Sequence, residues 1–174
     1  MLPLKEIDMQ IPKKGTIIDL GCGEGVIAKF LSQDANRNVI GVDLDIRRIE
    51  KSTRRNLSFK NADIRTYKFK EVDGVVVSDV LHHLNFPDQE KVLLNISKSL
   101  KKGGTLVIKE IDTQEFIRSK LSRFWDFIFY PKEKIYFSNA KELQRKLKRF
   151  GFKVSTKRKS KFFPGSTMLF VCKR

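Results

Sequence analysis

Residues 16–25, TIIDLGCGEG, decide the fold of this chain. The first three are β-branched, which predicts a short buried strand that closes at Asp19 and Leu20. Glycines then stand at alternate positions from Gly21 to Gly25, where they permit a positive φ and a close approach of the backbone to a ligand. An amphipathic helix follows, and the free N–H groups of its first turn favour a negatively charged group. The stretch therefore predicts the first unit of a nucleotide-binding α/β fold.

The spacing of these glycines distinguishes between classes of nucleotide. A dinucleotide site needs G-x-G-x-x-G at the start of the helix. Here the third glycine comes one position early, and Val26 stands where that pattern needs glycine. Asp19 precedes the glycines, where a carboxylate suits a ligand with a positive amino group better than it suits a pyrophosphate. The spacing therefore disfavours an NAD-dependent oxidoreductase.

Strand and helix patterns alternate along the remaining chain. Apolar runs predict further strands over residues 39–43, 57–59, 73–78, 105–111, 151–154 and 167–171. Helical patterns cover residues 24–32, 45–53, 88–100 and 138–150, and we expect Gly103-Gly104 to end the third helix in a left-handed cap. This order predicts an α/β fold with a doubly wound, mostly parallel seven-stranded sheet, helices on both faces and a C-terminal antiparallel hairpin.

Length and composition limit the function classes further. The 174 residues suffice for a single domain, residues 1–174, with residues 1–15 as a short leader. No apolar run approaches the ~20 residues of a membrane span, and no signal peptide is recognisable, so a cytoplasmic location is the default expectation. Two cysteines, Cys22 and Cys172, and two histidines lack a zinc-ligand spacing, so we expect no metal.

The charge distribution is unusual. Lys and Arg number 36 against 20 Asp and Glu, which gives a net charge of +16, and residues 113–174 hold most of the excess. Such an asymmetry indicates an anionic partner, RNA or a membrane surface, for the C-terminal third of the chain. A basic surface that is merely solvated explains the same composition, and both interpretations stay open.

The segment DLGCGEG, residues 19–25, resembles motif I of the class I S-adenosylmethionine-dependent methyltransferases. VIGVDLD (39–45), KNADIRTY (60–67) and VVVSDVLHHL (75–84) follow in the family's order, and the resemblance covers about residues 13–112. It implies a methyltransferase with S-adenosylmethionine as cofactor and S-adenosylhomocysteine as product. The cofactor-binding residues that it implies are Asp19, Gly21, Cys22, Gly23, Gly25, Asp43, Leu44, Ala62, Asp63, Ile64 and Ser78.

The resemblance also implies separate roles along the cofactor. Asp19 would face the amino group of the methionine part, beside backbone contacts from the glycine turn. Asp43 would accept both ribose hydroxyls, which the two oxygens of a carboxylate permit. Leu44 would lie against the adenine ring, and Asp63 would accept the adenine amino group.

Methyl transfer from a sulfonium is an in-line displacement, to which a protein contributes mainly by alignment and exclusion of water. His82 and His83 are the only histidines, and both follow the strand that ends at the expected reaction site. Either imidazole is a candidate base for an acceptor that must lose a proton. The same LHHL element is explained by an imidazole that only packs beneath the cofactor, so these two interpretations remain open.

Residues 112–137 are the expected substrate cap, because the family varies between the fifth strand and the following helix. The stretch FWDFIFY, residues 124–130, is apolar around most of a helix. This favours a small-molecule or lipid-like acceptor, a homodimer contact or docking on an anionic membrane. The alternative is an RNA methyltransferase that uses the basic C-terminal third. A non-catalytic binding partner with the same fold is disfavoured, because the motif residues are all present.

Overall fold

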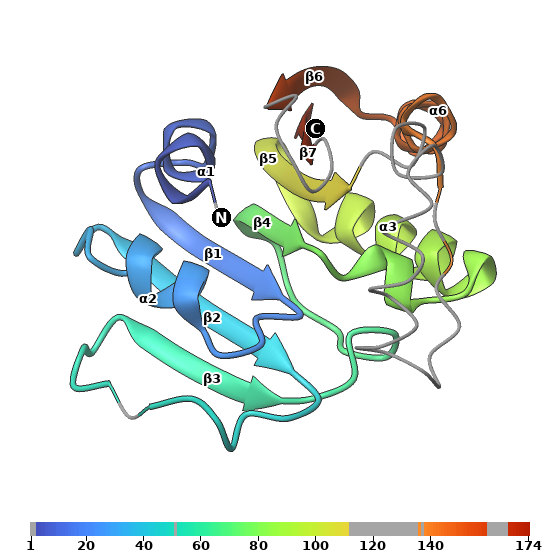
Figure 1. Cartoon of the computed structure of the whole chain (residues 1–174). Coiled ribbons are helices and arrows are strands. Elements are labelled where there is room, and N and C mark those ends of the chain that lie inside the picture. The colour runs from blue at the N-terminus through green and yellow to red at the C-terminus, as the bar shows by residue number, and fades with distance from the viewer. Residues whose placement is uncertain (1–2, 51, 112–135, 137, 160–166) are drawn as a thin grey trace.

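The computed structural model describes residues 3–50, 52–111, 136, 138–159 and 167–174 (Figure 1). Within these ranges one sheet has the strand order β3-β2-β1-β4-β5-β7-β6. Its strands are β1 (Gly15–Leu20), β2 (Arg37–Asp43), β3 (Leu57–Asn61), β4 (Val72–Ser78), β5 (Leu100–Ile111), β6 (Lys153–Lys159) and β7 (Thr167–Lys173). Strands β1 to β5 pair in parallel, whereas β7 pairs antiparallel with both β5 and β6. The predicted fold class and the C-terminal hairpin are confirmed.

Helices cover both faces of the sheet (Figure 1). Those described are α1 (Leu4–Gln10), α2 (Val26–Leu31), α3 (Phe86–Ser99) and α6 (Ala140–Arg149), with a 3-10 turn η1 at Leu81–His83. Neighbouring residues of β1 point to opposite faces: Ile17 packs with α1 and α2, and Ile18 with α3 and α6. A continuous apolar strand is typical of a sheet that is buried on both sides. None of the described helices is long and apolar enough to cross a membrane.

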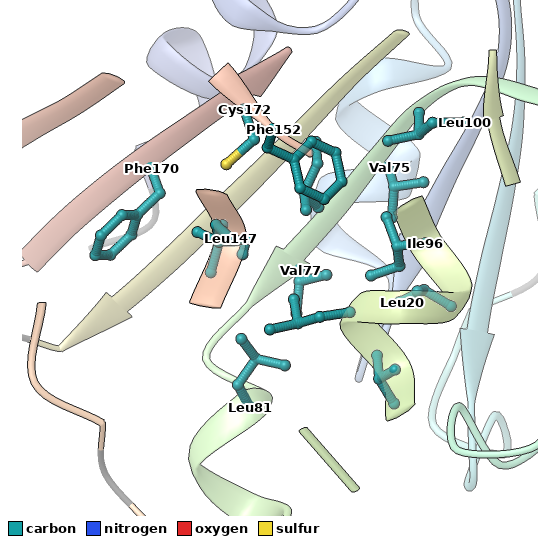
Figure 2. Close-up of a cluster of buried hydrophobic side chains, with 14 of the residues drawn as sticks. Leu20, Val75, Val77, Leu81, Ile96, Leu100, Leu147, Phe152, Phe170 and Cys172 are labelled. Atoms are coloured by element: carbon teal, nitrogen blue, oxygen red, sulfur yellow. The ribbon is translucent and has the colours of Figure 1, made fainter. Parts of the chain in front are cut away.

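The larger of the two hydrophobic clusters lies between the sheet and helices α3 and α6. Figure 2 shows Ile96 of α3 and Leu147 of α6 among side chains from β4 and β7, including Val75 and Phe170. All four are at most 1 % exposed. Burial of this kind contributes about 1.5–3 kcal/mol for each large apolar side chain, so the cluster fixes the sheet beneath the functional site.

The expected leader contains a helix that the sequence reasoning missed. In α1, Ile7 is fully buried, and Ile11, the first residue after the helix, is 2 % exposed. Both belong to the cluster on the α1 and α2 face of the sheet. An ion pair of 2.6 Å between Asp8 and Arg37 joins the helix to the first residue of β2. Residues 4–11 are therefore an integral part of the fold.

The helix expected over residues 45–53 is absent from the described residues 45–50 and 52–53, which hold a turn at residues 47–48, a bend at residue 49 and otherwise no regular structure. Asp45 accepts a hydrogen bond from the Arg47 N–H at 3.1 Å and also pairs with the Arg47 guanidinium. Such local side-chain bonds compete with a helix. The segment's described apolar residues, Ile46 and Ile49, are too few to bury a helical face, and a helix this short is marginal without one. The prediction was wrong for this reason.

The glycine cap expected after the third helix is also wrong. Helix α3 ends at Ser99, and Leu100 is already extended as the first residue of β5. Gly103 does adopt a positive φ of 81°, but it lies inside β5. There the pairing with β4 shifts register between Val72 and Gly74. The positive φ of Gly103 therefore belongs to an irregularity within the strand and not to a helix cap.

Candidate functional site

A cleft lies at the carboxyl ends of β1 and β4 and holds about 690 Å³ of empty space, open solvent included. In this sheet the chain reverses its direction of winding between these two strands, and ligands of open α/β sheets bind at that point. The cleft is lined by Asp19, Gly21, Cys22, Gly23, Glu24, Val26, Ile27, Ser78 and Asp79. The fold thus brings together the predicted residues Asp19, Gly21, Cys22, Gly23 and Ser78, whereas the predicted Gly25 does not line the cleft.

Two glycines shape this cleft in different ways. A Cβ on Gly21 would lie 2.4 Å from a methyl carbon of Val80, so only glycine permits the turn to pack against the end of β4. A Cβ on Gly23, by contrast, would meet no atom within 4 Å. Gly23 has a φ of 51° and presents open backbone, which is the close approach that a bound cofactor needs. The turn therefore leaves its backbone accessible from the cleft at Gly23.

Asp19, at the inner end of the cleft, is 1 % exposed. Its Oδ2 accepts a hydrogen bond of 3.1 Å from the N–H of Ala28, which ties β1 to helix α2. Burial raises the pKa of this carboxyl to about 7, against the lowering effect of the Ala28 hydrogen bond, and the nearby charge of Asp43 adds to the rise. Burial likewise raises the pKa of the Cys22 thiol to about 12, so this cysteine is no nucleophile at neutral pH.

Asp43 stands at the end of β2, next to β1 in the sheet. Its Oδ2 accepts the N–H of Gly23 at 2.8 Å, and its Oδ1 accepts the N–H of Asp45 at 3.0 Å. Its carbonyl accepts the N–H of Ala62 at 2.9 Å, which joins the ends of β2 and β3. Leu44 is 67 % exposed beside it. The residues expected around ribose and adenine thus flank the cleft on the side of β2 and β3, without lining it.

Asp63 and Ile64 follow β3 on this flank. The Asp63 carboxylate accepts hydrogen bonds from the Arg65 guanidinium at 2.8 and 2.9 Å, and these bonds lower the pKa of Asp63. Ile64 is buried and packs into the cluster beneath α3. The predicted contacts of both residues with adenine stay predictions.

A second pocket opens beside the cleft, at the ends of β4 and β5. It is lined by Leu81, His82, Gln89, Glu110, Tyr136, Ser138, Ala140, Leu143, Met168 and Phe170. His82 Nδ1 lies 2.7 Å from Glu110 Oε2, and Glu110 Oε1 accepts the N–H of Leu81 at 2.9 Å. Burial lowers the pKa of His82, but the hydrogen bond and the charge of Glu110 raise it more, so it lies above the ordinary value. This geometry orients the imidazole.

The two candidate histidines are therefore not equivalent. His82 is largely buried in the pocket wall, whereas His83 is exposed and does not line the pocket, although the two ring centroids are 4.2 Å apart. Sequence reasoning missed Glu110. The sequence signal for Glu110 was its position near the end of β5, the strand beside the one that ends at the predicted reaction site. The expected substrate cap, residues 112–137, lies outside the described residues except for Tyr136, whose N–H donates to the His82 carbonyl.

A family model described as "Methyltransferase domain" matches residues 4–157 of the chain. The chain is 35% identical over 130 residues to a ubiquinone/menaquinone biosynthesis C-methyltransferase of Wigglesworthia glossinidia brevipalpis, which covers 67% of the chain and 51% of that protein. It is 32% identical over 138 residues to an mRNA cap guanine-N(7) methyltransferase of Candida glabrata, covering 67% and 33%. The chain thus spans about a third to half of the length of such curated relatives.

Solved structures share the fold. A SAM-dependent methyltransferase from Archaeoglobus fulgidus has a TM-score of 0.78 at 17% identity, covering 98% of this chain and 91% of that one. The magnesium protoporphyrin IX methyltransferase of Synechocystis PCC 6803, solved with bound SAH, has a TM-score of 0.74 at 17% identity, covering 98% and 82%. The cleft at β1 and β4 lies within the region that the family model matches.

Proposed function

The chain belongs to the S-adenosylmethionine-dependent class I methyltransferase family, and we propose that it transfers the cofactor's methyl group to a small-molecule or lipid-like acceptor. When bound, the cofactor supplies an electrophilic methyl group on a sulfonium. The chain's own residues then have three tasks: to hold the cofactor, to align the acceptor and to accept a proton if the acceptor loses one.

For the cofactor, we propose that the methionine part lies along Asp19, the glycine turn and Ser78, and the adenosine part along the ends of β2 and β3. The open backbone at Gly23 supports the first placement. The second is supported by the exposed side chain of Leu44 and by the carboxylate of Asp43 beside it. Each Asp43 oxygen accepts one backbone N–H and retains a second lone pair for a ribose hydroxyl.

The observation that carries the acceptor proposal is the pocket around His82. Its walls combine apolar side chains, among them Leu143, Met168 and Phe170, with polar residues that include His82, Gln89 and Glu110. Apolar walls with a few convergent polar groups are typical of small-molecule sites. Because Glu110 is an acceptor, Nδ1 of His82 carries the proton, and Nε2 is the basic nitrogen. We propose His82 as the general base and assign His83 no direct role.

An RNA acceptor is the second candidate. It is supported by the likeness to the mRNA cap methyltransferase and by an exposed basic stripe on α6, formed by Lys141, Arg145 and Lys148. Spacings of four and three residues put these side chains on one face of the helix. Helix α6 also supplies Ala140 and Leu143 to the pocket, so an RNA bound along the basic stripe would lie next to the proposed acceptor site.

Isothermal titration calorimetry with S-adenosylmethionine, S-adenosylhomocysteine and NAD tests the proposal. We expect the first two to bind and NAD to leave no heat signal. Binding of NAD alone would overturn the cofactor assignment. A following screen of lipid-like, small aromatic and capped-RNA acceptors, with transfer of a labelled methyl group as the readout, separates the two acceptor classes.

A further inference from the structure

Asp79, the first residue after β4, has an unusual backbone conformation. Among the described residues it is the only one other than glycine with a positive φ, at 56°. Its N–H donates to the Lys109 carbonyl at 2.9 Å, and its Oδ2 pairs with the Lys109 ammonium. Lys109 belongs to β5, so both contacts come from the neighbouring strand. A side chain rarely adopts this conformation unless its surroundings impose it, and such positions cluster at ligand sites.

The second oxygen of the same carboxylate is unsatisfied. Asp79 Oδ1 is buried and has no hydrogen-bond partner in the part of the chain that the structure describes. A buried acceptor without a donor costs free energy, and native proteins keep few of them. Asp79 lines the cleft together with Asp19 and Ser78. A ligand in that cleft is therefore positioned to provide the missing donor.

We infer that Asp79 is an ammonium-binding residue, whose Oδ1 receives the charged amino group of the cofactor's amino-acid part. The inference rests on the proposed function, because it needs the cofactor in this cleft. An ammonium group has three N–H donors, so Asp19 alone leaves donors to satisfy. A carboxylate can accept the Lys109 ammonium on one oxygen and a ligand's ammonium on the other.

The state of Asp19 supports a second carboxylate at this point. Burial raises the pKa of Asp19 to about 7, so near neutrality this group carries only part of a negative charge. Its Oδ2 is also engaged by the backbone of α2. A glycine would adopt this backbone conformation at lower cost, so the position keeps aspartate for its side chain. One oxygen, Oδ2, is the counter-charge of the largely buried Lys109 ammonium, which leaves Oδ1 for a contact with ligand.

The test compares two ligands that differ in the amino-acid part. S-adenosylhomocysteine carries the amino group, and 5′-methylthioadenosine lacks it. Asp79→Asn removes the charge but keeps a residue that tolerates positive φ. Asp73→Asn is the matched control, because Asp73 pairs with Lys101 on the same two strands, β4 and β5, at the opposite edge of the sheet. Calorimetry measures both affinities for each variant.

We expect Asp79→Asn to weaken binding of S-adenosylhomocysteine about tenfold or more while 5′-methylthioadenosine changes less than about twofold. Asp73→Asn should alter neither affinity. Asp79→Gly is a second variant: relief of the strain offsets part of the cost of leaving the Lys109 ammonium without its counter-charge, and affinity for S-adenosylhomocysteine should still fall. Equal losses for both ligands, or an unchanged affinity for S-adenosylhomocysteine, would overturn the inference. Failure of the wild type to bind either ligand would instead overturn the proposed function, and the inference with it.

Discussion

Asp43 accepts a 2.8 Å hydrogen bond from the backbone N–H of Gly23, twenty residues earlier in the chain. The aspartate ends β2, and the glycine lies in the turn behind β1, so the bond fixes the turn against the neighbouring strand. The residue proposed to hold the ribose thus also sets the shape of the loop proposed to hold the methionine part. Both halves of the cofactor site depend on one carboxylate.

Asp43→Ala should therefore reduce cofactor affinity severely, by at least about tenfold, and lower stability by about 1 kcal/mol through loss of the Gly23 hydrogen bond. Asp43→Asn keeps an oxygen acceptor and should retain most of the stability but not the affinity. Calorimetry with S-adenosylhomocysteine and thermal melts measure the two effects. An unchanged affinity in folded Asp43→Ala protein would show that the ribose lies elsewhere.

The pair of His82 and Glu110 predicts a pH signature. Glu110 holds the pKa of His82 above its ordinary value, so Glu110→Gln should lower it. The raised pKa contributes stability that is present below about pH 6.5 and is lost as pH rises through the pKa of the folded state. The stability difference between wild type and Glu110→Gln should therefore be largest at acid pH and shrink toward alkaline pH. Titration of the imidazole carbon-bound protons by NMR follows the pKa directly.

The two histidines should differ in turnover once an acceptor is known. Loss of a general base typically costs 10²–10⁴-fold in rate, so His82→Ala should lower kcat by about that factor while cofactor affinity stays within about twofold. His83→Ala serves as the matched control and should retain most of the activity. Equal and small losses in both variants would favour the packing role of the LHHL element.

Asp19 predicts the opposite pH trend from that of a stabilising carboxylate. Its pKa is about 7 in the folded state against 3.8 when unfolded, so the folded state binds the extra proton and stability falls as pH rises from about 4 to 7. Asp19→Asn removes this penalty and keeps an oxygen acceptor for the Ala28 N–H. Chemical denaturation at two pH values measures the free energy of unfolding. The value for Asp19→Asn relative to the wild type should be higher at pH 8 than at pH 4.5, by on the order of a few kcal/mol. A constant difference across this range would contradict the assigned pKa.

The sequence predicted the parts of the site that depend on local chain geometry. The glycine turn behind Ile17 and Ile18, and the acid at the end of the next strand, follow from residue type and spacing, and parallel strands bring their carboxyl ends to one edge. Glu110 was not predictable in this way. Its partner His82 lies 28 residues away, and only the pairing of β4 with β5 brings the two together.

The errors have physical causes of the same kind. Residues 1–15 were expected to be a leader, although Leu4, Ile7 and Ile11 have helical spacing. So short a helix is marginal in isolation, and it is stabilised here because the sheet buries its apolar side chains. Residues 45–53 were expected to form a helix, yet the Asp45 carboxylate pairs with Arg47 in a turn. In the first segment tertiary contacts stabilise a helix, and in the second local side-chain bonds outweigh helix propensity.

The link between α1 and the sheet gives the last prediction. The Arg37 side chain is 1% exposed, and its guanidinium pairs with Asp8 Oδ1 at 2.6 Å and donates to the Pro12 carbonyl at 2.8 Å. Asp8→Ala leaves a buried cation without its counter-charge and should cost about 3 kcal/mol. Lys13→Ala removes the other, exposed partner of the same carboxylate and should cost less than about 1 kcal/mol. In Asp8→Ala/Arg37→Met no buried charge remains, so the double variant should recover part of the loss. Urea denaturation of the wild type and the three variants gives these differences. If Asp8→Ala costs no more stability than Lys13→Ala, the ion pair with Arg37 does not hold α1 on the sheet.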